Sequence, residues 1–104
     1  MNDKSAFVSE LLRAANDVER LGPPEVRRLL HRAIVCIRDQ REFVGIPGSG
    51  TPSDEIIVLM NVATRAERFT RSDWARALLD AAEMIRALRI VADTQAKTMI
   101  RDAS

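Results

Sequence analysis

Apolar residues in the last third of the chain recur at alternating spacings of four and three, which is the period of one face of an α-helix. The series begins at Trp74 and ends at Met99, and only Gln95 interrupts it with a polar residue. This pattern predicts one helix over about residues 71–101, roughly 45 Å long at 1.5 Å per residue. A helix of that length needs a second surface to cover its apolar face, either this chain folded back or a second copy, so the pattern indicates assembly.

The same period predicts three earlier helices, over about residues 5–21, 24–44 and 52–68. Gly22 and the two prolines after it end the first helix, and Pro24 is well suited to the first turn of the second, where a missing N–H costs nothing. The second helix has a broad apolar arc, which is typical of a helix covered on two sides in a bundle.

The junction between the last two helices contains the residues of a helix cap. Thr70 is placed to cap the last helix, with Asp73 at its third position and with Phe69 and Trp74 spaced as a hydrophobic staple. These residues favour a tight corner at Thr70. No glycine or proline lies beside it, so a continuous helix through this point is the alternative.

The segment 45–51 holds three of the four glycines, which predicts a flexible loop. Short connections elsewhere make neighbouring helices antiparallel. The predicted fold is therefore all-α: a four-helix up-down bundle with a long C-terminal helix, formed by residues 1–104 as one helical domain.

The composition is that of a folded protein, with 46% hydrophobic and 30% charged residues and a net charge of +1. The lone Cys36 is typical of a reducing compartment. The longest unbroken apolar stretches have five residues, such as Ile56 to Met60, which is far too short for a membrane span or a signal peptide. We therefore expect a cytoplasmic protein that does not enter a membrane.

The sequence contains no complete catalytic, metal or cofactor motif, so we expect a protein that is not an enzyme. Gly45, Gly50 and Thr51 have part of the spacing of a phosphate-binding loop but lack its lysine. His31 and Cys36 are the only residues of their types and lie on different sides of one helix, so they form no dyad. The chain also lacks the ligands for a zinc site and the Glu-x-x-His pairs of a di-iron bundle. We expect no cofactor.

Two groups of arginines remain as candidate binding surfaces. One lies on the 24–44 helix and includes Arg27 and Arg28, and the other surrounds the predicted corner and includes Arg65, Arg68 and Arg71. Such groups are more often solvated faces or interface arginines than phosphate-binding patches.

These observations favour a non-enzymatic module that binds another protein through helical apolar faces, as an adaptor, an inhibitor or a subunit of an assembly, and that forms a homodimer. The alternative is a dimeric nucleic-acid-binding regulator that uses both arginine groups. An enzyme that uses His31 in a site completed by a partner is the least favoured reading. The candidate partner-binding residues are Arg27, Arg28, Arg65, Arg68, Arg71, Leu88 and Met99.

Overall fold

A computed structural model describes the backbone of residues 3–44 and 54–103 and the side chains of residues 6–42 and 56–91. Within these ranges the chain is helical and contains no strand, which confirms the all-α bundle. The loop predicted over residues 45–51 lies outside the described residues. The α-helices are α1 (Asp3–Asn16), α2 (Pro23–Val44), α3 (Asp54–Thr64) and α4 (Arg71–Ala103), and two short 3₁₀ turns cover Val18–Arg20 and Ala66–Arg68.

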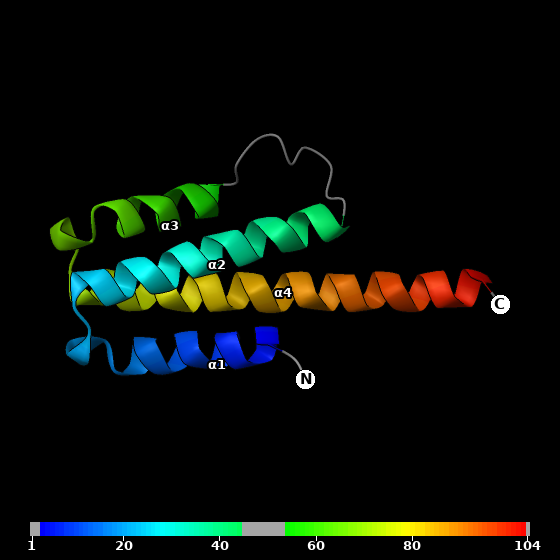
Figure 1. Cartoon of the computed structure of the whole chain (residues 1–104), viewed down its shortest axis with the longest axis horizontal. Helices are drawn as coiled ribbons and strands as arrows, with labels where there is room; N and C mark the ends of the chain where they lie inside the picture. Colours follow the sequence, from blue (N-terminus) through cyan, green and yellow to red (C-terminus); the bar gives the residue numbers. More distant parts are fainter. Residues whose placement is uncertain (1–2, 45–53, 104) are drawn as a thin grey trace.

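Helix α4 is the element against which α1 and α2 pack. It has 33 residues, or about 50 Å at 1.5 Å per residue, and the whole molecule measures 52 Å along its longest axis. Helices α1 and α2 pack extensively on α4, while α3 packs mainly on α2 and less on α4. Each helix in Figure 1 runs opposite to the one before it, and the C-terminal part of α4 extends beyond the other three.

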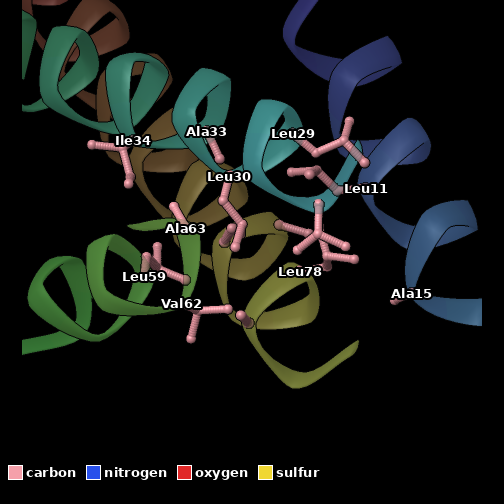
Figure 2. Packing of buried hydrophobic residues seen from close by; sticks show 14 of the residues in the cluster. Leu11, Ala15, Leu29, Leu30, Ala33, Ile34, Leu59, Val62, Ala63 and Leu78 are labelled. Carbon is pink, nitrogen blue, oxygen red and sulfur yellow. The ribbon is translucent and has the colours of Figure 1, made fainter. Parts of the chain in front are cut away.

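The hydrophobic core lies along the first half of α4. Figure 2 shows labelled core side chains from α1 (Leu11), α2 (Leu30), α3 (Leu59) and α4 (Leu78) turned into the space between the helices. The core-facing residues of α4 are buried as far as Ile85, Leu88 is partly buried, and Ile90 and Val91 are exposed. The predicted long helix is therefore continuous, and its first half belongs to the core.

The two helices that precede a corner are shorter than their apolar period predicts. The helix predicted over 5–21 ends at Asn16, and the one predicted over 52–68 ends at Thr64. In each case a single 3₁₀ turn follows, and the next residue is extended. Because a 3₁₀ turn still points an apolar residue at the core every third position, periodicity does not distinguish it from a final α-helical turn.

The corner before α4 is closed by a capping box, as predicted from the sequence. The Asp73 backbone N–H donates to Thr70 Oγ1 at 3.1 Å, and the Thr70 N–H donates to Asp73 Oδ2 at 3.1 Å. These two bonds satisfy backbone donors that a new helix leaves without partners. The cap therefore confirms a break at Thr70 and excludes the continuous helix.

The start of α2 has one of the two hydrogen bonds of a capping box. The Gly22 N–H donates to Glu25 Oε2 at 2.9 Å. A Cβ atom at Gly22 would lie 2.9 Å from that same oxygen, so a larger residue there requires the Glu25 carboxylate to move and weakens this bond.

Candidate interaction site

The corner between α3 and α4 positions the predicted arginines, and it is anchored by Trp74. This side chain is 5% exposed, and its indole Nε1 donates to the Ala66 carbonyl at 2.9 Å. Phe69, the extended residue that follows the 3₁₀ turn, packs against the core. Because a buried indole N–H needs an acceptor, the bond fixes the 3₁₀ turn to the first turn of α4.

Arg27 joins α2 to this corner. Its Nε donates to the Ala63 carbonyl at 3.1 Å, and its Nη2 forms an ion pair with Glu67. The pKa of Glu67 lies below its ordinary value because the carboxylate accepts a bond from its own backbone N–H and another from Arg27. Arg27 is thus already engaged within the chain, and its first role is to hold the corner against α2.

The other predicted arginines are exposed. Arg65 precedes the 3₁₀ turn, Arg68 is its last residue, Arg71 begins α4, and Arg28 lies on the outer side of α2. None of the four forms an ion pair with another described residue. The Arg71 guanidinium lies 5.9 Å from the Trp74 ring centroid, within the range of a cation–π contact. Since Arg27 binds Glu67, the start of α2 and the corner are brought side by side.

The outer face of α3 carries apolar side chains that were not among the predicted binding residues. Ile57 is 45% exposed, Val58 53% and Met60 47%. The exposed polar residues of the same helix, Asn61 and Thr64, are uncharged. We call the exposed residues Ile57, Val58, Met60, Asn61 and Thr64 the α3 face. Exposed sides of the other helices carry charges at close intervals, so the α3 face is the longest uncharged surface among the described helices.

One signal in the sequence marks the α3 face. The apolar stretch from Ile56 to Met60 is continuous, so apolar residues point both into the core and away from it. A helix with one solvated face alternates apolar with polar positions at the helical period. The continuous stretch departs from that pattern, because Ile56 and Leu59 are buried while Ile57, Val58 and Met60 remain exposed.

Two apolar partner-binding residues were predicted on α4, and the structure describes the side chain of Leu88 but not that of Met99. Leu88 is partly buried and packs against the core, so part of its side chain is already covered. Ile90, two residues later, is 64% exposed. Met99 lies in the helical part of α4, but its side chain is outside the described residues.

Residues that could support chemistry are dispersed. His31 is exposed on α2, and Cys36 is partly buried against the core. No group of three His, Cys, Asp or Glu residues within the described chain is arranged to hold a metal ion. A hollow along α1 is lined by small and polar side chains, and Glu10 in its wall binds Arg32 of α2 at 3.2 Å.

No described helix combines the length and the apolar composition needed to cross a bilayer. No family model matches the chain, and neither a curated protein nor a solved structure does. The geometry of the described residues therefore carries the functional argument.

Proposed function

We propose that this chain is a non-enzymatic protein–protein interaction module, with the α3 face as its principal binding surface. The observation that carries the proposal is the combination of Ile57, Val58 and Met60, each about half exposed, on a surface without charge. Single exposed apolar residues are normal on a folded protein, whereas several of them on one uncharged side of a helix favour a binding site.

The size of the α3 face indicates what else the interface contains. Full burial of three half-exposed side chains contributes about 1 kcal/mol each. Lost translational and rotational freedom on association costs about 4–15 kcal/mol. The apolar contact alone does not offset that cost, so the interface also needs contacts at its edge. Arg65 and Arg68 lie at one end of the face, are exposed, and belong to a residue type enriched at binding hot spots.

A pair of matched variants tests this function. Val58→Lys places a charge in the α3 face, and Val91→Lys makes the same change at an exposed valine of α4. Each variant and the unchanged protein are immobilised, and proteins retained from an extract of the source cells are identified. The proposal expects a defined partner that binds the unchanged protein and Val91→Lys but not Val58→Lys. Equal retention by all three would contradict it.

Nucleic-acid binding is the second candidate, supported by the exposed arginines Arg65, Arg68 and Arg71 around one corner. The net charge of +1 gives this function little support. Phosphate contacts release counterions, so binding to DNA or RNA must weaken steeply as salt is raised. A fluorescence titration of duplex DNA and of RNA at several salt concentrations measures this dependence. An affinity that does not change with salt excludes phosphate recognition.

A further inference from the structure

Two described surfaces leave neighbouring apolar side chains exposed, namely the α3 face and the part of α4 around Ile90 and Val91. On α4, the charged residues Arg86 and Arg89 lie within a helical turn of these side chains. The α3 face has no charge between Ile56 and Thr64. A partner helix can therefore cover the α3 face without burying a charge, which favours it as the interface.

The charges at the two ends of α3 indicate what the partner is. Helix α3 begins with Asp54 and Glu55, and Arg65 and Arg68 follow its end. A second α3 laid antiparallel to the first brings the acidic start of each helix beside the basic end of the other. A parallel arrangement brings like charges together. The helix dipoles favour the antiparallel arrangement as well.

We propose that the α3 face binds the α3 face of a second copy of this chain, antiparallel and across a two-fold axis. This inference rests on the proposed function and names its partner. Asp54, Val58 and Asn61 are spaced by four and three residues within α3, and Arg65 is the residue that follows the end of the helix at Thr64. A two-fold axis midway between positions 54 and 65 places position 54 opposite position 65 of the second copy, and position 58 opposite position 61.

Two further observations fit a pair of identical chains. A net charge of +1 produces little repulsion between copies. Arg65 and Arg68 are exposed and form no ion pair with a described residue, so they are available at the edge of the face. Helix α3 is only about 16 Å long. The surface area on one face of so short a helix is smaller than the area that each partner buries in a stable interface, which is about 800 Å². The dimer is therefore weak and depends on concentration.

Sedimentation velocity over a series of protein concentrations measures this self-association. We expect a shift from monomer to dimer as the concentration rises. Val58→Lys raises the dissociation constant by about tenfold or more, whereas the matched Val91→Lys leaves it unchanged. Circular dichroism of each variant verifies that it is folded. A dimer lost in Val91→Lys and kept in Val58→Lys would overturn the proposal in favour of the end of α4.

Charge reversal tests the antiparallel register. Asp54→Arg and Arg65→Glu each place like charges at both paired positions, so each weakens the homodimer. The double variant Asp54→Arg/Arg65→Glu restores opposite charges at both positions, and dimerisation returns. Mixing the two single variants gives a heterodimer stronger than either homodimer, because each copy supplies the charge that the other lacks. A double variant no stronger than the single variants overturns the register.

The outcomes separate self-association from the broader function. A chain that stays monomeric at every concentration overturns the dimer. If such a monomer still loses a foreign protein partner in Val58→Lys but not in Val91→Lys, the interaction module stands and only its self-pairing fails. If neither self-association nor partner binding responds to Val58→Lys, both proposals fail.

Discussion

Gln40 provides the most demanding test of how the core is built. This residue lies in the apolar stripe of α2 and is 2% exposed, and its Oε1 accepts no hydrogen bond from any described residue. A buried acceptor without a donor is a cost to the folded state. Methionine is unbranched and similar in length but has no amide, so Gln40→Met removes that cost while filling the same space.

The expected gain follows from the burial of this one atom. A buried polar group without a partner costs about 1–3 kcal/mol. Taking the lower end, Gln40→Met raises the free energy of unfolding by about 1 kcal/mol, and Tm rises by roughly 4 °C for a domain of this size.

Urea denaturation monitored by circular dichroism measures this gain. We expect a higher midpoint at an unchanged m value, because m changes only when the folded or unfolded state changes its exposed surface. Glu42→Met, at an exposed position of the same helix, serves as the control and stays within about 0.5 kcal/mol of the unchanged protein. A Gln40→Met variant less stable than the unchanged protein would show that the amide is satisfied in solution and that our reading of this site is wrong.

Three further predictions concern the packing of α4 and its corner. Ile85→Asp places a charge at a fully buried position and lowers the free energy of unfolding by several kcal/mol. Leu88→Asp, at a partly buried position, lowers it less, and thermal melts of the two variants show which is the less stable. Thr70→Ala removes the acceptor of the Asp73 N–H and costs about 0.5–2 kcal/mol, which urea titration measures. The pKa of Glu67 is lowered, so its carboxylate stabilises the fold above its ordinary pKa, and this contribution is lost as the pH falls through the lowered value. Glu67→Gln therefore reduces stability at neutral pH but not in strong acid, and equal losses in urea titrations at both pH values would contradict the role of the ion pair with Arg27.

The elements that the sequence predicts best are those with both a long apolar period and a cap. Helix α4 begins at Arg71 as predicted, because Thr70 and Asp73 supply a local signal that does not depend on distant residues. Helix α2 begins at Pro23, one residue before the predicted start. The first and third helices end at Asn16 and Thr64, earlier than the predicted ends at 21 and 68, because each is followed by a 3₁₀ turn that packs Val18 or Ala66 against the core.

The candidate site was harder to predict because it depends on what each helix meets in space. Arg27 and Arg28 are adjacent and identical in the sequence, yet only Arg27 reaches the Ala63 carbonyl and Glu67, which lie far along the chain. Ile57 and Val58 follow directly on buried Ile56 and have the same apolar character. Periodicity finds the face of a helix that is buried in its own chain, but it does not identify a second apolar face that remains exposed.

We propose that this chain binds through the α3 face. Backbone amide spectra recorded by NMR from low micromolar to millimolar protein concentration report on that surface residue by residue. The signals expected to move with concentration are those of Ile57, Val58, Asn61 and Arg65. Signals that stay fixed there, or that move only around Ile90 and Val91, would contradict it.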